Sequence, residues 1–284
     1  MIRVILLAST LLAQSAGTTP AAAPVPRDPA LPPSAEQAKA ALDSSPRHGE
    51  YVDVPYAGGP ALKTWISYPE RKDKAGVVIV IQEVFGLTDW LRGVADQLAK
   101  EGFIAVAPDM VSGYGPNGGG TDSVPSRDDV VALVRKISPD EAVRRLNAVR
   151  AWALKIPSGN GKIGTVGFCW GGGQSFAYAG AQPALEAAVV YYGTSPEPPV
   201  IDAIRAPVLG HYGGDDERVD ATIPPAEAQM KKLGKSFDVH IYPGAGHGFL
   251  RDQSGRDGAN LKATQQAWPR TVAFLNENLG RRKD

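Results

Sequence analysis

The 284-residue sequence contains a single cysteine, Cys169, and only four histidines. One cysteine cannot form a disulfide within the chain, and it cannot supply the paired thiolates of a structural zinc site. The histidines, at positions 48, 211, 240 and 247, include no pair at the spacing of metal ligands. We therefore expect neither a disulfide nor a metal site.

The chain also has no excess of charge of either sign, because 30 acidic residues balance 30 basic ones. No basic stripe is available for a nucleic acid, so a nucleic-acid partner is not expected. No glycine-rich phosphate fingerprint follows the first strand–helix turn, and we therefore predict no nucleotide cofactor. With 43% hydrophobic residues, the chain has enough apolar side chains to build one sizeable core.

Long hydrophobic runs are absent except at the N-terminus. Arg3 precedes the uncharged apolar run Val4–Ala13, and small residues follow it. This pattern is typical of a secretory signal peptide and is short for a membrane span, so stable membrane insertion is not expected. We predict a signal peptide over residues 1–17, a disordered Pro- and Ala-rich linker over 18–48, and a periplasmic or secreted protein.

The one cysteine lies in the stretch Gly167–Gly171, with the sequence GFCWG. The run Lys162–Val166 before it is typical of a strand, and Gln174–Gly180 after it is typical of a helix. A Gly-x-nucleophile-x-Gly core between a strand and a helix is the sharp turn that carries the nucleophile in α/β-hydrolases. The alternative is a buried structural cysteine that precedes a glycine-rich turn.

Two later segments supply the groups that a nucleophilic thiol needs, which are a base and a residue that orients it. A buried strand ending at Tyr212 runs into Gly213–Asp216, and the strand Phe237–Tyr242 precedes a glycine-rich loop that carries His247. Catalytic groups of open α/β sheets lie at the carboxyl ends of strands. The order Cys169, Asp216, His247 is also that of α/β-hydrolases. We therefore predict that these three side chains converge.

Strand-like and helix-like segments alternate along the chain from about residue 49. This alternation predicts an α/β-hydrolase fold, with a mostly parallel central sheet and helices on both faces. The expected parallel strands are Gly76–Gln82, Phe103–Pro108, Lys162–Val166, Ala187–Tyr192 and Pro207–Tyr212. Tyr51–Val54 and Ala61–Tyr68 are expected as antiparallel edge strands. The expected helices are Trp90–Lys100, Glu141–Leu154, Gly172–Gly180, Pro224–Leu233 and Leu261–Leu279.

Several motifs together resemble those of the dienelactone hydrolases. The elbow continues as Gly171-Gly172-Gly173, and similar family motifs match Gly213–Val219, Gly244–Phe249, Gln82–Leu87 and Ala107–Asp109. The resemblance covers residues 49–284 and implies cleavage of an ester or lactone, of the carboxymethylenebutenolidase type. It leaves the role of the glycine-rich loop 113–122 and the oligomeric state open.

The resemblance also implies a role for each site residue. Cys169 would attack the carbonyl, with His247 as base and Asp216 holding its orientation. The backbone N–H groups of Val84 and Trp170 would bind the oxyanion. Glu83 would contact the thiol until substrate arrives and would then swing away, and Arg251 would pair with a substrate carboxylate and with the displaced Glu83.

Other functions are compatible with the same residues. A thioesterase or a cysteine peptidase would use the same three side chains, and a catalytically inactive relative would bind a small carboxylate or another protein. A complete set of thiol, imidazole and carboxylate favours an enzyme, because a binding protein does not need all three. The expected partner is therefore a small-molecule ester or lactone.

Overall fold

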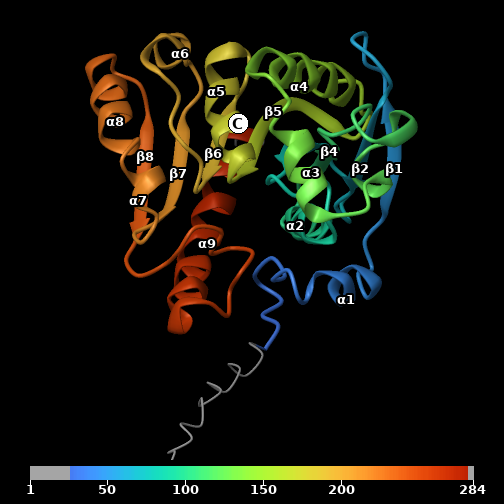
Figure 1. Ribbon diagram of the computed structural model, residues 1–284, viewed down its shortest axis with the longest axis horizontal. Helices are drawn as coiled ribbons and strands as arrows, with labels where there is room; N and C mark the ends of the chain where they lie inside the picture. The colour runs from blue at the N-terminus through green and yellow to red at the C-terminus, as the bar shows by residue number, and fades with distance from the viewer. Residues whose placement is uncertain (1–25, 281–284) are drawn as a thin grey trace, which may run out of the picture.

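The computed structural model describes residues 26–280, and Figure 1 shows them arranged around one central sheet. The predicted signal peptide, residues 1–17, and the first part of the predicted linker lie outside this range. Eight strands form the sheet in the order β1-β2-β4-β3-β5-β6-β7-β8. They are β1 (Gly49–Val54), β2 (Leu62–Ser67), β3 (Ala75–Ile81), β4 (Ile104–Pro108), β5 (Gly159–Phe168), β6 (Ala187–Tyr191), β7 (Val208–Gly213) and β8 (Phe237–Tyr242).

Strands β3 to β8 are parallel to one another, and β1 and β2 are antiparallel additions at one edge. The predicted mostly parallel sheet is thus confirmed. The helices are α1 (Ala38–Asp43), α2 (Asp89–Lys100), α3 (Arg127–Val134), α4 (Pro139–Ala153), α5 (Trp170–Ala181), α6 (Pro198–Ala203), α7 (Glu217–Asp220), α8 (Ile223–Lys232) and α9 (Ala259–Leu279).

Both faces of the sheet are covered because its central strands are apolar on both sides. In β3 every residue is buried. Val77, Ile79 and Ile81 point to one face and belong to the core layer that also contains residues of α4, α5, α6 and α8. Val78 and Val80 point to the other face and belong to the core layer that also contains residues of α1, α2 and α9 (Figure 1). Successive side chains of a strand point to opposite faces of the sheet, and a layer of helices covers each face, so alternate residues of β3 enter different core layers.

Residues 26–48 correct one prediction. A disordered linker was expected over residues 18–48, but the described part of this segment is folded onto the domain and contains α1. Leu31 and Ala38 are buried in the same core layer as α2 and α9. We call residues 26–48 the N-terminal arm. Among residues 26–280, no helix is both long and apolar enough to cross a membrane.

The sheet register brings the chemistry-bearing loops to one edge. Ile81 pairs with Gly167, so Glu83 and Cys169 each lie two residues beyond the same rung of the sheet. The parallel pairing of β7 with β8 ends at Gly213 and Tyr242, and the loops with Asp216 and His247 follow directly. The carboxyl ends of parallel strands therefore gather these four residues.

Candidate active site

Cys169 stands in the sharp turn between β5 and α5. Its φ of +54° is a left-handed conformation that side chains rarely adopt, so the turn is strained. A Cβ on Gly171 would lie 2.3 Å from the carbonyl oxygen of Gln82, and one on Gly167 would lie 1.9 Å from the carbonyl oxygen of Gly171. Glycine is thus required on both sides of the cysteine, which is itself only partly buried.

His247 and Asp216 meet at the same edge. His247 Nδ1 lies 2.5 Å from Asp216 Oδ2, and the Asp216 side chain is 8% exposed. Asp216 is the N-cap residue of the short helix α7, but its backbone carbonyl, not its carboxylate, accepts the N–H groups of Val219 and Asp220. The neighbouring Asp215 instead pairs with Arg256 at the surface, at 3.0 Å. Of the two adjacent carboxylates, the structure therefore gives His247 only Asp216.

The imidazole of His247 has two favourable partners. Burial alone lowers the pKa of His247, but a hydrogen bond and charge interaction with Cys169, followed by those with Asp216, raise that pKa to about 9. The protonated ring is thus stabilised between sulfur and carboxylate. His247 and Asp216 thus meet where the sequence order places them, and Cys169 is among the groups that act on the ring. A ring in this position can hold a proton taken from the thiol.

Glu83 is buried beyond the end of β3 and is paired with Arg251. Arg251 Nε lies 2.7 Å from Glu83 Oε2, although off the line of a straight hydrogen bond. Burial raises the pKa of Glu83, and the charges of Arg251, His247 and Arg127 oppose that rise. Glu83 is therefore paired with Arg251, which the sequence analysis expected only after Glu83 had left the thiol.

A second arginine approaches the same place from the chain between β4 and α4. The guanidinium carbon of Arg127 lies 3.5 Å from the centre of the Phe85 ring, and that of Arg251 lies 5.3 Å from it. The three residues line a cavity of about 400 Å³ together with Trp90, Val124 and Val130. Asp89, the one carboxylate in the lining, is paired with Arg92. A partly apolar cavity with two further guanidinium groups favours a flat anionic group. The sequence did not align Arg127 with this site.

The two predicted oxyanion donors lie on elements that touch each other. Trp170 is the first residue of α5, where backbone N–H groups have no partner within the helix. The start of α5 packs on the end of β3 at Gln82, two residues before Val84. The side chains of Val84 and Trp170 also pack against one apolar cluster, formed by Val111, Val130 and Val134.

Tyr192 was not singled out from the sequence. It directly follows β6 with a φ of +40°, which is unusual for a tyrosine. Its ring lies edge-on to His247, with centroids 5.1 Å apart. Its hydroxyl is buried without a hydrogen-bond partner among the described residues. Burial first, and the nearby charges of Glu83 and Cys169 next, raise its pKa well above the usual value, so the hydroxyl stays protonated and is available as a donor.

The glycine-rich loop 113–122 is fastened to the loop that carries Glu83. The Thr121 hydroxyl donates to Asp109 Oδ1 at 2.8 Å and accepts from the Leu87 N–H at 3.1 Å. Asp109, which is 2% exposed, also accepts the Thr121 N–H at 2.6 Å. Gly86 has a φ of +79°, and a Cβ there would meet the Thr121 hydroxyl at 2.2 Å. Loop 113–122 therefore supports residues 83–87 from outside.

The other histidines lie away from Cys169. His48 is exposed beside Glu50, and His240 is near Asp238 on β8. His211 is buried in β7, where Nδ1 bonds the Tyr242 hydroxyl at 2.9 Å and Nε2 the Thr271 hydroxyl at 3.1 Å. Within the described part of the chain, no group of three or more His, Cys, Asp or Glu side chains is arranged to hold a metal ion.

Comparison with known proteins identifies relatives of this chain. A family model described as "Dienelactone hydrolase family" matches residues 62–279. "Carboxymethylenebutenolidase 1" of Cupriavidus pinatubonensis is 30% identical over 227 residues, which cover 79% of this chain and 95% of that protein. A protein of Methylorubrum extorquens named "Putative carboxymethylenebutenolidase" is 31% identical over 264 residues, covering 87% of each chain. The crystal structure of "Putative Dienelactone Hydrolase" from Klebsiella pneumoniae is similar with a TM-score of 0.71 and 26% identity, over 81% of this chain and 99% of that one.

Proposed function

The chain belongs to the dienelactone hydrolase family of ester and lactone hydrolases, and we propose that Cys169, His247 and Asp216 carry its reaction. The single observation that most supports this proposal is the position of the His247 ring. The ring bonds Asp216 through Nδ1 at 2.5 Å and interacts with the Cys169 thiol. A base held between a nucleophile and an orienting carboxylate is the arrangement that nucleophilic catalysis requires.

In the proposed first step, the Cys169 sulfur attacks the carbonyl carbon of the substrate while its proton passes to His247. The N–H groups of Trp170 and Val84 bind the oxyanion that forms, in a site where each donor is worth about 10²–10³ in kcat. The carbon–oxygen bond to the leaving group then breaks, and His247 gives its proton to the departing oxygen. The product of this step is a thioester on Cys169.

In the second step, water attacks the thioester carbonyl while His247 accepts one of its protons. The carbon–sulfur bond breaks, the proton returns to the sulfur and the carboxylic acid leaves. Asp216 stays ionised throughout and stabilises the imidazolium in both steps. No redox change or added cofactor is needed for the balance of this reaction.

For the substrate, we propose an ester or lactone that carries a free carboxylate in addition to the bond that is cleaved. Arg251 and Arg127 place two positive groups around Phe85, and within residues 26–280 Arg251 forms an ion pair only with Glu83. A substrate carboxylate offers Arg251 a stronger partner than a glutamate whose burial raises its pKa. Exchange of the partner would free Glu83 to move. Binding of the anionic group would thus change the position of Glu83 at the site.

The test compares wild type with Cys169→Ala on p-nitrophenyl esters, carboxylated lactones and thioesters. We expect turnover and an acyl adduct at Cys169 by intact-protein mass spectrometry in the wild type. The variant should show neither, while its circular dichroism spectrum and melting temperature stay the same. Turnover retained by Cys169→Ala would exclude the thiol mechanism. A kcat/KM for thioesters several orders of magnitude above that for esters and lactones would show that the protein is a thioesterase instead.

A further inference from the structure

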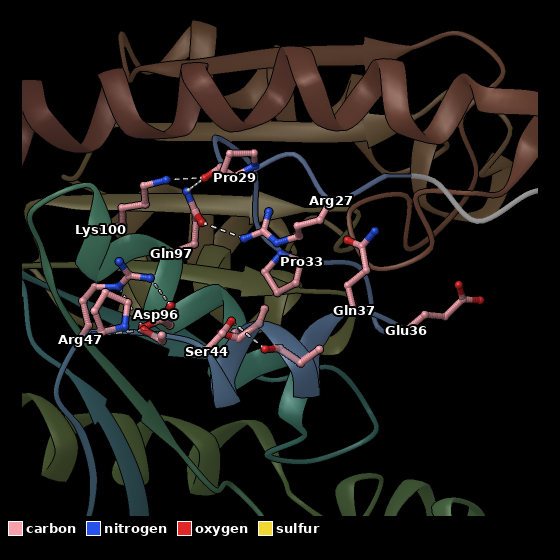
Figure 2. A pocket seen from close by; sticks show the side chains of 15 residues that line it. Arg27, Pro29, Pro33, Glu36, Gln37, Ser44, Arg47, Asp96, Gln97 and Lys100 are labelled. Atoms are coloured by element: carbon pink, nitrogen blue, oxygen red, sulfur yellow. Dashed lines mark hydrogen bonds and ion pairs between the residues drawn. The ribbon is translucent and has the colours of Figure 1, made fainter.

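The N-terminal arm is fastened firmly to helix α2 (Figure 2). Arg47 and Ser45 both bind the Asp96 carboxylate, with Arg47 Nε at 2.9 Å and Ser45 Oγ at 2.6 Å. Lys100 donates to the Pro29 carbonyl at 2.6 Å. These bonds border a cavity of about 520 Å³ between the arm and α2, whose lining is separate from that of the proposed active site. The arm is therefore a fixed part of the fold.

The contact of the Pro33 ring with Gly93 sets the position of the arm along α2. A Cβ on Gly93 would lie only 2.6 Å from Cγ of Pro33, which is buried. The proline ring thus sits directly on the helix backbone, where any side chain would displace it. Because a proline ring cannot turn aside as a flexible side chain can, displacement must shift the arm itself.

The opposite side of the arm holds the loop that carries Arg251. The Ala35 N–H donates to the Arg251 carbonyl oxygen at 2.9 Å. The Gln253 side-chain amide, which is 4% exposed, donates to the Pro32 carbonyl at 2.9 Å and to the Leu250 carbonyl at 3.1 Å. One amide group therefore ties the arm to the Arg251 loop.

The arm also reaches the cavity beside the Glu83–Arg251 pair. Ala35 lines this cavity together with Phe85, Arg127 and Arg251. The arm precedes residue 62, where the match to the family model begins. The wall at Ala35 is thus contributed by a part of the chain that the family model does not include.

We propose that arm residues 32–35 form a wall of the pocket for the anionic part of the substrate. Ala35 and Gln253 act as positioning residues for Arg251, so the arm sets the preference for an anionic group over a neutral one. This inference rests on the proposed function, because it takes the partner of Arg251 to be part of an ester or lactone. A guanidinium reads a carboxylate through fixed geometry, so a shift of the backbone under Arg251 weakens that recognition first.

Two variants loosen the arm from opposite sides without touching Cys169 or His247. Gly93→Ala pushes Pro33 away from α2, and Gln253→Leu removes the amide that ties the arm to the Arg251 loop. Their matched controls are Gly59→Ala, where a Cβ meets nothing within 4 Å, and Gln265→Leu on the exposed side of α9. If Gln253→Leu does not fold, Gly93→Ala carries the test alone, because alanine favours a helix over glycine.

The first measurement is the ratio of kcat/KM for an ester with a carboxylate on its acyl group to kcat/KM for a neutral ester of the same shape. Each loosening variant should lower this ratio about tenfold, mainly through KM of the charged ester, and each control should leave it unchanged. An unchanged ratio in Gly93→Ala, or an equal loss on both esters together with a lower melting temperature, overturns the proposal.

The second measurement does not depend on activity. Hydrogen exchange of the amides in residues 248–253 should become faster in both loosening variants and remain unchanged in both controls. If the wild type hydrolyses neither ester, the proposed function fails, but exchange still tests the arm. Unchanged exchange in Gly93→Ala then shows that the arm does not position the Arg251 loop, and the proposed role of the arm is overturned as well.

Discussion

Arg251 Nε lies 2.7 Å from the Oε2 atom of Glu83, whose side chain is only 3% exposed. A carboxylate removed from water to this degree favours its neutral form, and the guanidinium opposes that tendency. The pair therefore balances the cost of desolvating Glu83 against the attraction of one cation. Removing Arg251 leaves the buried Glu83 carboxylate without compensation.

Arg251→Met should destabilise the protein in a pH-dependent way. The pKa of Glu83 is raised in the folded state, so its contribution to stability falls as pH rises above the unfolded value of 4.5. Without Arg251 this loss increases, and we expect a cost of about 3–5 kcal/mol at pH 8 that is much smaller at pH 5. Urea unfolding at the two pH values measures the difference.

Arg256→Met is the matched control for that variant. Its ion pair with Asp215 is exposed, so its removal should change the free energy of unfolding by less than about 1 kcal/mol at either pH. An equal cost of Arg251→Met at pH 5 and pH 8 would show that the ionisation of Glu83 does not respond to Arg251.

Thr121→Val should lower kcat with little change in KM for a neutral ester. The substitution keeps the shape of the side chain but removes the hydroxyl that joins Asp109 to the Leu87 N–H. Residues 83–87 would then lose their outer support, and with it the placement of the Val84 N–H, so we expect a loss of about 10-fold or more in kcat. Steady-state kinetics on a neutral p-nitrophenyl ester measures the effect.

Thr121→Ser should restore most of that activity, because it keeps the hydroxyl. Melting temperatures distinguish misplacement of residues 83–87 from a general loss of stability, since a general loss would lower activity only near the unfolding transition. If Thr121→Val retains full kcat, the contact between loop 113–122 and residues 83–87 has no part in positioning the site.

Gly171→Ala should destabilise the fold strongly, whereas Gly173→Ala should not. Both lie in the first turn of α5, but a Cβ at Gly171 would meet the Gln82 and Ile81 carbonyl oxygens at 2.3 and 2.4 Å. At Gly173 the nearest atom is Thr194 Oγ1 at 3.3 Å. We expect a loss of about 3 kcal/mol or more for the first and less than about 1 kcal/mol for the second. Similar unfolding midpoints in urea for the two variants would contradict the packing described.

His211 should make the protein sensitive to acid. Burial first, and the charges of His240 and Arg270 next, lower the pKa of His211 well below 6.5. The unfolded chain therefore takes up a proton that the folded chain refuses, and stability falls as pH drops below about 6.5, by up to about 1.4 kcal/mol per pH unit. Thermal unfolding between pH 7 and pH 5 should show this slope.

His211→Gln should flatten that slope, because glutamine bonds to neighbouring hydroxyls without titrating. His48→Gln is the control, since His48 is exposed and its loss should leave the slope as in the wild type. A slope that persists unchanged in His211→Gln would assign the acid sensitivity to other groups.

The sequence predicted what depends on local pattern and chain order. The apolar runs of β3 to β7 and the alternation of β8 identified the strands, and the loops after them located Cys169, Asp216 and His247. The meeting of Asp216 and His247 follows from these positions, since parallel strands end at one edge. Helices α6 and α7 are too short to leave a periodic signal.

Contacts between distant segments were not predictable in the same way. The arm is rich in Pro and Ala, a composition typical of a flexible linker. Its long-range contacts, among them the bonds to Asp96 and Gln253, the ring contact at Gly93 and the burial of Leu31, show why it folds. Arg127 reaches Phe85 because loop 113–122 folds back through Thr121. Neither contact has a signature in local spacing.

The partly buried thiol at the elbow has a further consequence wherever the protein meets peroxide. Peroxide converts a reactive thiolate to a sulfenic acid, which a neighbouring cysteine usually captures as a disulfide. These 284 residues contain no second cysteine that could act in this way. Recovery of an oxidised Cys169 through a disulfide therefore needs a thiol from outside the chain, and without one a second equivalent of peroxide converts the sulfenic acid to the irreversible sulfinic acid.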